Sequence, residues 1–100
     1  MSARPLISLV VPAFNEEEVL EEFHRAVSGV LATMDADAEF VFVDDGSRDR
    51  TKLIIESLAA TDSRVRGVVL SRNFGHEAAI EAGLRASRGD AVVVMDADLQ

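Results

Sequence analysis

The sequence has 100 residues, enough for one small domain, with 48% apolar and 28% charged residues, a composition that excludes an intrinsically disordered chain. A formal net charge of −8 opposes binding to a phosphate backbone, so nucleic acid is not an expected partner. The absence of cysteine excludes disulfides, thiolate metal sites and a cysteine nucleophile. No apolar run approaches the roughly 20 residues of a membrane-spanning helix. Both observations predict a chain that is cytosolic in character.

Strand-like and helix-like apolar patterns alternate along the chain. Short β-rich apolar runs end in polar turn residues, and between them apolar residues recur at steps of three and four. Ser47 or Asp49 is expected to cap the second helix, which fades near residue 60. The predicted strands are residues 6–11, 39–44, 65–71 and 91–96, and the other two helices are residues 19–34 and 74–87. The order is β-α-β-α-β-α-β.

This alternation predicts an α/β fold, specifically a Rossmann-like open parallel sheet with helices on both faces. The last strand is expected to be buried because residues 92–95 are all apolar. Where the winding of such a sheet reverses, a crevice forms at the carboxyl ends of the strands, and ligands bind there. Four polar loops lie at that edge in the predicted fold: "PAFNEE", "DDGSRD", "SRNFGH" and "DADLQ".

Acidic side chains are concentrated in these loops. They would repel one another and any anionic ligand unless a cation lay between them. Oxygen ligands of this kind suit Mg²⁺ or Mn²⁺, which complete their coordination with water and phosphate oxygens. The residues that predict such a site are Glu16, Asp44, Asp45, Asp96 and Asp98, with the amide of Gln100 as a further candidate ligand.

The segments "ISLVVPAFNEEEVL", "FVFVDDGSRDRT" and "LSRNFGHEAAIEAGLRASRGDAVVVMDADLQ" resemble the amino-terminal half of a family 2 glycosyltransferase with the GT-A fold. The resemblance is greatest to the branch that makes polyprenyl-phosphate sugars, such as dolichyl-phosphate mannosyltransferase and bactoprenol glucosyltransferase. It covers nearly the whole chain. It implies that residues 1–100 are the nucleotide-sugar-binding half of a catalytic domain, ending just after the Asp-x-Asp motif.

The resemblance also implies roles for individual residues. Asp98 is the expected catalytic residue, and it would share a metal with Asp96 and Gln100 that bridges the donor diphosphate. One departure from the family pattern is Phe14, where many relatives carry tyrosine, so a phenolic hydroxyl is missing. His24 is expected on the protein surface, and His76 either contacts a phosphate or lies on the surface. The residues expected around the donor are Pro12, Ala13, Asn15, Glu16, Asp44, Asp45, Ser47, Arg72, Asn73 and Asp96.

The activity implied is metal-dependent, inverting transfer of a sugar from a UDP- or GDP-linked donor to a polyprenyl phosphate, either dolichyl or undecaprenyl. The full-length protein would act at the cytoplasmic face of a membrane. The acceptor would bind through a carboxyl-terminal half, so the isolated chain is expected to be inactive. The last strand would lie near an open edge of the sheet, and the chain is expected to self-associate through that edge.

Two other function classes fit part of the pattern. A receiver-like, Mg²⁺-binding phosphoacceptor domain is also a parallel α/β unit, but its paired acids follow the first strand, whereas here they follow the second. An inactive assembly fragment without a ligand is the other alternative. A dinucleotide-binding oxidoreductase is excluded, because "PAFNEE" has no glycine where that fold needs a Gly-x-Gly-x-x-Gly turn.

Overall fold

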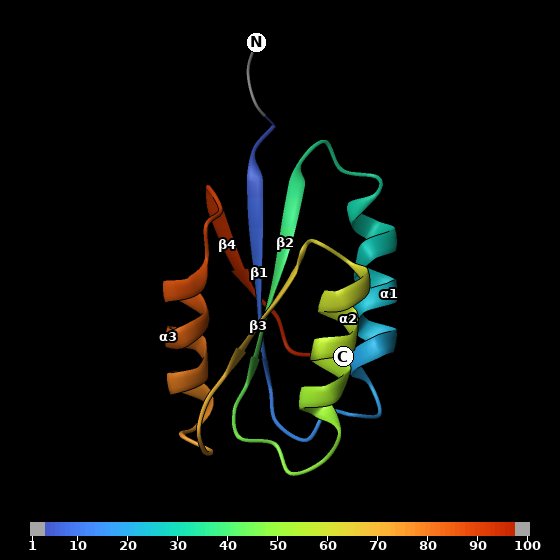
Figure 1. The fold of residues 1–100 in the computed structure, drawn as a ribbon. Helices are drawn as coiled ribbons and strands as arrows, with labels where there is room; N and C mark the ends of the chain where they lie inside the picture. The colour runs from blue at the N-terminus through green and yellow to red at the C-terminus, as the bar shows by residue number, and fades with distance from the viewer. Residues whose placement is uncertain (1–3, 98–100) are drawn as a thin grey trace.

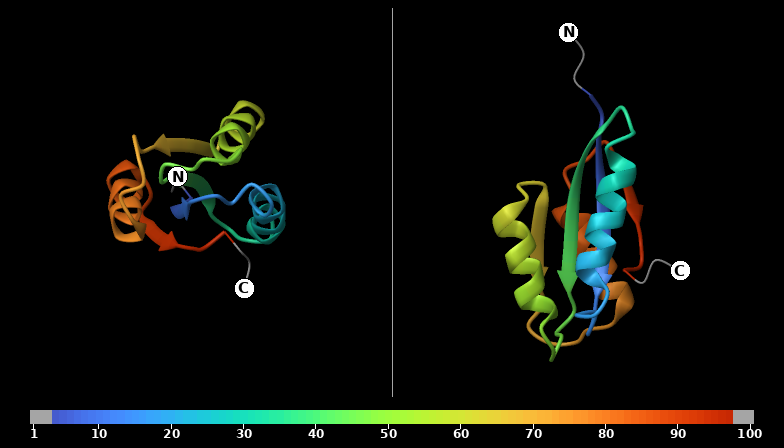
Figure 2. Two further views of the ribbon diagram at one scale, coloured as in Figure 1. Left: turned by 90° about the horizontal axis from the view of Figure 1, so that it is seen from below. Right: turned by 90° about the vertical axis from the view of Figure 1, so that its right-hand side faces the viewer.

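The computed structural model describes residues 4–97 and contains the seven predicted elements in the predicted order. Figure 1 shows a central sheet with α1 and α2 on one side and α3 on the other, and the same layers are visible from below in Figure 2. The elements are β1 (Leu6–Ala13), α1 (Leu20–Leu31), β2 (Asp37–Asp44), α2 (Thr51–Thr61), β3 (Val65–Val69), α3 (His76–Ala86) and β4 (Ala91–Val94).

The four strands are parallel and lie in the order β3-β2-β1-β4. From β1 the chain moves outward to β2 and then β3, with α1 and α2 covering one face of the sheet. It then returns across the other face as α3 and adds β4 beside β1. Because right-handed crossovers place helices on opposite faces when the direction of winding changes, the reversal lies between β1 and β4.

Each face of the sheet has its own apolar core. Under α1 and α2 the core contains the three buried aromatic rings of Phe23, Phe40 and Phe42, with Phe23 meeting Phe42 edge-on at 6.2 Å. Under α3 the core is smaller and consists of Val10, Val41, Val43 and Ala79. Successive strand residues point to opposite faces, so residues of the same strand contribute to both cores.

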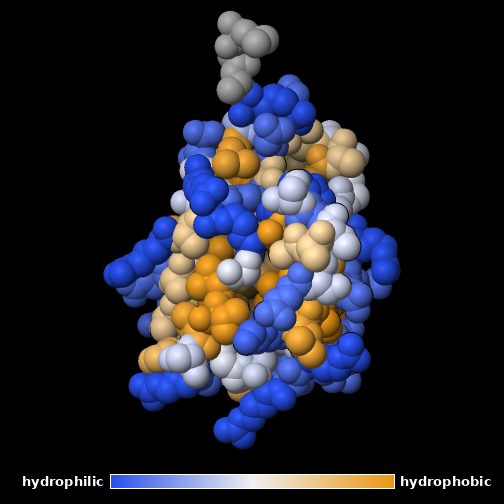
Figure 3. All heavy atoms as spheres, viewed as in Figure 1, coloured by the Kyte–Doolittle hydropathy of each residue, from blue (hydrophilic) through white to orange (hydrophobic). Residues whose placement is uncertain are grey.

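Strand β4 corrects one sequence-based expectation. Its apolar residues predicted burial, yet Val92, Val93 and Val94 are 40%, 45% and 42% exposed. The reason is position: within residues 4–97, β4 pairs with β1 on one side and has no partner strand on the other. A strand's own composition does not fix whether a neighbour covers it. The other edge strand, β3, also exposes Val69, and Figure 3 shows apolar surface on the face turned to the viewer in Figure 1.

Smaller expectations also change. Helix α1 ends at Leu31, before the predicted residue 34. Arg50, not Ser47 or Asp49, is the N-cap residue of α2, although Asp49 accepts a hydrogen bond from the Thr51 N–H. His24 is not a surface residue: its side chain is 17% exposed and pairs with Asp62 at 2.8 Å. Among the helices of residues 4–97, none combines the length and apolar character required to cross a bilayer.

Candidate functional site

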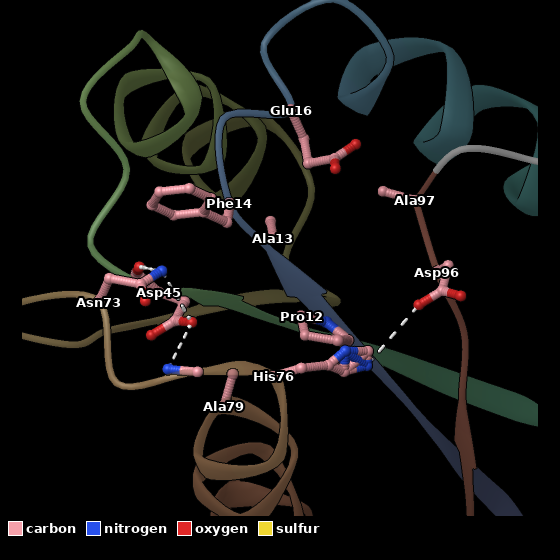
Figure 4. Close-up of a pocket in the computed structure, with 11 residues that line it drawn as sticks. Pro12, Ala13, Phe14, Glu16, Asp45, Asn73, His76, Ala79, Asp96 and Ala97 are labelled. Atoms are coloured by element: carbon pink, nitrogen blue, oxygen red, sulfur yellow. Dashed lines mark hydrogen bonds and ion pairs between the residues drawn. The ribbon is translucent and has the colours of Figure 1, made fainter.

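A cavity of about 340 Å³ opens at the carboxyl ends of β1 and β4, where the winding of the sheet reverses. Ligands bind at this place in open α/β sheets, so the position alone makes it the candidate site. The loops after β1, β2 and β3, the start of α3 and the end of β4 all reach it (Figure 4). The lining residues are Pro12, Ala13, Phe14, Glu16, Asp45, Asn73, Gly75, His76, Ala79, Asp96 and Ala97.

The loop after β1 is fixed by the loop after β2. Asn15 adopts a positive φ of 54°, which asparagine tolerates better than most residues. Its backbone N–H donates to the Ser47 hydroxyl at 2.9 Å, and its side-chain oxygen accepts from the Arg48 N–H at 2.9 Å. The Glu16 N–H donates to the Thr51 hydroxyl at 2.8 Å. Asn15 and Ser47 therefore hold the two loops together and do not line the cavity.

Asp49 strengthens the same junction between the two loops. Burial raises the pKa of its carboxyl, but hydrogen bonds from the Thr51 hydroxyl, the Thr51 N–H and the Glu17 N–H outweigh this effect and hold the pKa below its ordinary value. Asp49 is therefore ionised at neutral pH, and it joins the start of α2 to the loop that precedes α1.

The two aspartates at the end of β2 are both buried, and they face different partners. Asp44 is 2% exposed and accepts a hydrogen bond from the Ser47 N–H at 3.0 Å. Asp45 is 4% exposed and accepts from the N–H groups of Phe74 and Gly75 at 2.8 and 3.1 Å. Asp44 closes its own turn, whereas Asp45 attaches the loop before α3 to the end of β2.

The loop after β3 contributes Asn73 to the cavity wall but not Arg72. The Asn73 amide donates to the backbone oxygen and the carboxylate of Asp45 at 3.2 and 3.3 Å. The Arg72 guanidinium stacks on the Phe74 ring, 4.5 Å from its centre, and lies outside the lining.

Asp96, just after β4, carries the most accessible carboxylate of the cavity. Its side chain is 70% exposed, and one of its oxygens lies 3.9 Å from Nε2 of His76. Figure 4 shows the two side chains facing each other beside Pro12, with Glu16 extending into the space toward Ala97. Asp98 and Gln100, the other expected metal ligands, lie outside the described residues.

The structure therefore brings together Pro12, Ala13, Glu16, Asp45, Asn73 and Asp96 from the predicted donor site. Asn15, Asp44, Ser47 and Arg72 lie in the same loops but do not line the cavity. Sequence reasoning did not assign Phe14, Gly75, Ala79 or Ala97 to the site and left His76 undecided. Phe14, Gly75, His76 and Ala97 lie within the four polar loops, and Ala79 lies one helical turn after His76, so membership of these loops is the signal that points to them.

Among the acidic residues that line the cavity, Asp96 is the best suited to bind a divalent cation. Within residues 4–97, no group of three or more histidine or acidic side chains is arranged to hold a metal. Asp45 already accepts three N–H groups, whereas Asp96 is exposed to the cavity and offers oxygen ligands of the kind that Mg²⁺ and Mn²⁺ prefer. Of the described carboxylates, Asp96 is therefore the one best placed to bind a metal ion.

Solved glycosyltransferases of the GT-A type share this fold. The mannosyltransferase PcManGT from Pyrobaculum calidifontis, in complex with GDP-Man and Mn²⁺, matches with a TM-score of 0.76 and 27% identity over 97% of this chain and 28% of its own. TarS from S. aureus, in complex with UDP-GlcNAc, matches with a TM-score of 0.77 and 28% identity over 92% of this chain and 26% of its own.

This chain belongs to glycosyl transferase family 2, whose profile matches residues 8–100. The bactoprenol glucosyl transferase of Shigella phage SfV is 47% identical over 94 residues, which are 94% of this chain and 31% of that protein. The undecaprenyl-phosphate 4-deoxy-4-formamido-L-arabinose transferase of Pseudomonas fluorescens is 44% identical over 95 residues, 94% of this chain and 28% of that protein. The chain thus spans under a third of the length of these relatives. Family membership sets aside the receiver-like alternative.

Proposed function

We propose that this chain is the donor- and metal-binding part of a transferase that moves a sugar from a nucleotide diphosphate to a polyprenyl phosphate, with inversion at the anomeric carbon. The observation that carries the proposal is the convergence of Asp96, Glu16 and Pro12 on one cavity at the switch point of the sheet. Glycosyltransferases of the same fold are known in complex with GDP-Man and Mn²⁺ and with UDP-GlcNAc, which supports a nucleotide sugar as the ligand.

The proposed division of roles follows from the surroundings of each residue. The loop after β1, with Pro12, Ala13 and Glu16, forms one side of the donor pocket. Asp45 and Asn73 fix the opposite wall, because their polar groups are bonded to each other and to the backbone before α3. Asp44, Asn15, Ser47 and Arg72 contribute by setting the shape of the loops.

Asp96, Asp98 and Gln100 are the residues that would hold the Mg²⁺ or Mn²⁺ ion. When bound, the ion supplies Lewis-acid stabilisation of the negative charge that develops on the leaving nucleotide diphosphate. In the transfer, an acceptor phosphate oxygen forms a bond to the anomeric carbon, and the bond from that carbon to the diphosphate oxygen breaks, with its electron pair leaving on the nucleotide. The catalytic role proposed for Asp98 is to help hold this ion.

A polyprenyl phosphate is the acceptor that best fits the relatives, whose names specify bactoprenol and undecaprenyl phosphate. Such an acceptor is already ionised at neutral pH, so a strong general base is less necessary than for a sugar hydroxyl. A lipid acceptor places the reaction at a membrane, and a nucleotide-sugar donor places it on the cytoplasmic face. The acceptor would bind outside the donor pocket, so we expect the isolated chain to bind a nucleotide without completing transfer.

The proposal is tested by the melting temperature of the chain with UDP or GDP, each with and without Mn²⁺. A nucleotide is expected to raise the melting temperature only when Mn²⁺ is present. Asp96→Asn and Asp98→Asn should abolish this metal-dependent increase while leaving the ligand-free melting temperature unchanged. Asp35→Asn is the matched control, because Asp35 is fully exposed in the turn before β2, at the opposite end of the sheet. A wild-type chain that binds neither nucleotide would favour the inactive assembly fragment.

A second copy of this chain is a further proposed partner. Within residues 4–97, β4 has no partner strand on its outer side and exposes apolar side chains there, and such edges pair with other strands unless they are covered.

A further inference from the structure

His76 is the first residue of α3 and faces the end of β4 across the cavity (Figure 4). Its side chain is 54% exposed, and its Nε2 lies 3.9 Å from an oxygen of Asp96. This separation exceeds the 2.7–3.2 Å of an N–H···O hydrogen bond. The imidazole and the carboxylate therefore approach each other without a direct hydrogen bond, and both remain accessible to a ligand between or beside them.

The charges in the cavity make this position informative. Among the described residues that line the cavity, Glu16, Asp45 and Asp96 are acidic and His76 is the only side chain that can be basic. A nucleotide diphosphate is strongly anionic. In a pocket whose other titratable groups are acids, it needs a positively charged or hydrogen-bond-donating partner. A cation at Asp96 offsets part of this repulsion, and His76 lies beside it.

Several hydrogen-bond donors at or beside the wall already have partners within the chain. The Asn73 amide and the N–H groups of Phe74 and Gly75 all donate to Asp45, and the Ala79 N–H donates to the Gly75 carbonyl. Pro12 has no N–H to offer. Within the described lining, the imidazole of His76 is the side-chain donor that remains for a ligand oxygen.

The backbone at His76 is held in place although its ring is exposed. Asp45 binds the two N–H groups that immediately precede it. One turn later Ala79 is fully buried, and Gly83 lies so close to the sheet that an added Cβ would be 2.4 Å from a methyl of Val10. The start of α3 is thus fixed against the sheet, while the imidazole is more than half exposed beside Asp96.

We propose that His76 contacts a phosphate oxygen of the donor's diphosphate through its ring N–H and so selects nucleoside diphosphates over monophosphates. The inference rests on the proposed function, because it concerns the same cavity. His76 is then a donor-binding residue, and Asp45 is the residue that positions it.

The test is calorimetric titration of the chain with UDP, GDP, UMP and GMP in the presence of Mn²⁺. His76→Ala should weaken diphosphate binding about tenfold, as expected for loss of one hydrogen bond to a charged group, and should change monophosphate binding less than about twofold. His76→Gln, which keeps an N–H donor, should recover most of the loss. Glu77→Ala is the matched control, because Glu77 is exposed in the same helical turn and does not line the cavity.

NMR gives a second test. If His76 had only a structural role, adding a nucleotide would not change its imidazole signals. The chain has two histidines, so the imidazole signals of His24 and His76 are readily distinguished by substitution. With diamagnetic Mg²⁺ present, UDP is expected to shift the His76 signals and to leave those of His24, which pairs with Asp62, in place. UMP should shift neither.

The outcomes separate the inference from the proposed function. If the wild-type chain binds diphosphates and His76→Ala binds them equally well, the inference is wrong and the proposed function stands. An equal loss for monophosphates and diphosphates would also overturn it, because the contact would then be to the nucleoside. If the wild-type chain binds no nucleotide with Mn²⁺, the proposed function fails and the inference fails with it.

Discussion

At the scale of single residues, Asp45 and Gly46 join the loop after β2 to the loop before α3. Asp45 supplies the hydrogen-bond acceptors, and Gly46 allows the two backbones to come close. A Cβ at position 46 would lie 2.4 Å from the backbone carbon of Arg72 and from the backbone nitrogen of Asn73. Gly46 also has a φ of 73°, which disfavours any other residue.

Gly46→Ala is therefore expected to destabilise the chain by roughly 2 to 4 kcal/mol, since the clash is with backbone atoms and the φ is strained. Urea unfolding measures the effect. Gly29→Ala is the control: Gly29 lies within α1 with nothing within 4 Å of an added Cβ, so alanine there should stabilise by about 0.5 to 1 kcal/mol. Equal stability of Gly46→Ala and wild type would contradict the close approach of the two loops.

The sequence predicted which loops form the site better than it predicted which side chains line it. The motifs placed Pro12, Asp45 and Asp96 on the rim correctly, because strand ends of a parallel sheet meet at one edge. The sequence did not predict the hydrogen bond from the Asn15 N–H to the Ser47 hydroxyl, since this bond depends on the positive φ of Asn15. Which polar group points into a cavity and which closes a turn is decided by backbone geometry that the motif does not encode.

At the scale of elements, α3 is held at both ends. Its start is bound by Asp45, and the connection after its end is bound by Glu39, a residue of β2 that is 7% exposed. Glu39 accepts hydrogen bonds from the Ser8 hydroxyl at 2.6 Å, the Arg88 N–H at 2.7 Å and the Arg66 guanidinium at 3.0 Å. Arg66 also donates to the Ala86 carbonyl at the end of α3, so this group ties three strands and the helix together.

Glu39 predicts a specific dependence of stability on pH. Burial raises the pKa of its carboxyl, but the hydrogen bonds from Ser8, Arg88 and Arg66 outweigh burial and lower the pKa overall. A folded-state pKa below the unfolded value of about 4.3 means that the contribution is present above that value and is lost as pH falls through the folded pKa.

Glu39→Gln should therefore lower the free energy of unfolding by about 1 to 3 kcal/mol at pH 7, because the ion pair with Arg66 is removed in a buried place. The difference from wild type should shrink as the pH falls below the unfolded pKa of about 4.3, because the unfolded wild-type chain then takes up a proton that the folded carboxyl still resists. Urea unfolding at a series of pH values measures it. Glu81→Gln, at an exposed i,i+4 pair on α3, should differ from wild type by less than about 0.5 kcal/mol at every pH. A Glu39→Gln deficit that is the same at pH 3.5 and pH 7 would refute the argument.

The order and type of all seven elements were predictable because each strand is a short apolar run and each helix has an apolar stripe. The burial of Glu39 was not, since a charged residue at a strand start usually faces solvent. Its three partners come from distant parts of the chain, at positions 8, 66 and 88. The apolar run of β4 predicted a strand correctly. It predicted burial wrongly, because a local sequence pattern does not show which other elements pack against the strand.

At the scale of the whole molecule, the reversal of the sheet that creates the cavity also leaves β4 at an edge. Beside this edge, α1 covers β1 only in part, and an apolar groove of about 410 Å³ lies between them. Val93 is both a lining residue of the groove and part of the exposed edge, at 45% exposure. The other residues of the groove are Ile7, Leu9, Ala26, Val27, Val30, Leu31, Met34 and Met95. In the described part of the chain, edge and groove meet at Val93 and together form one apolar surface.

The chain is accordingly expected to self-associate through β4, with a mass that rises with concentration in sedimentation or light scattering. Val93→Lys should shift the equilibrium toward the monomer by at least about tenfold, because a lysine on an edge strand must be desolvated for another strand to pair there. Val69→Lys is the matched control, since Val69 has similar exposure, 48%, on the opposite edge strand β3, and it should leave association unchanged. Circular dichroism of each variant checks that the fold is retained. A monomeric wild type at every accessible concentration, or an equal effect of the two lysines, would show that β4 is not the interface.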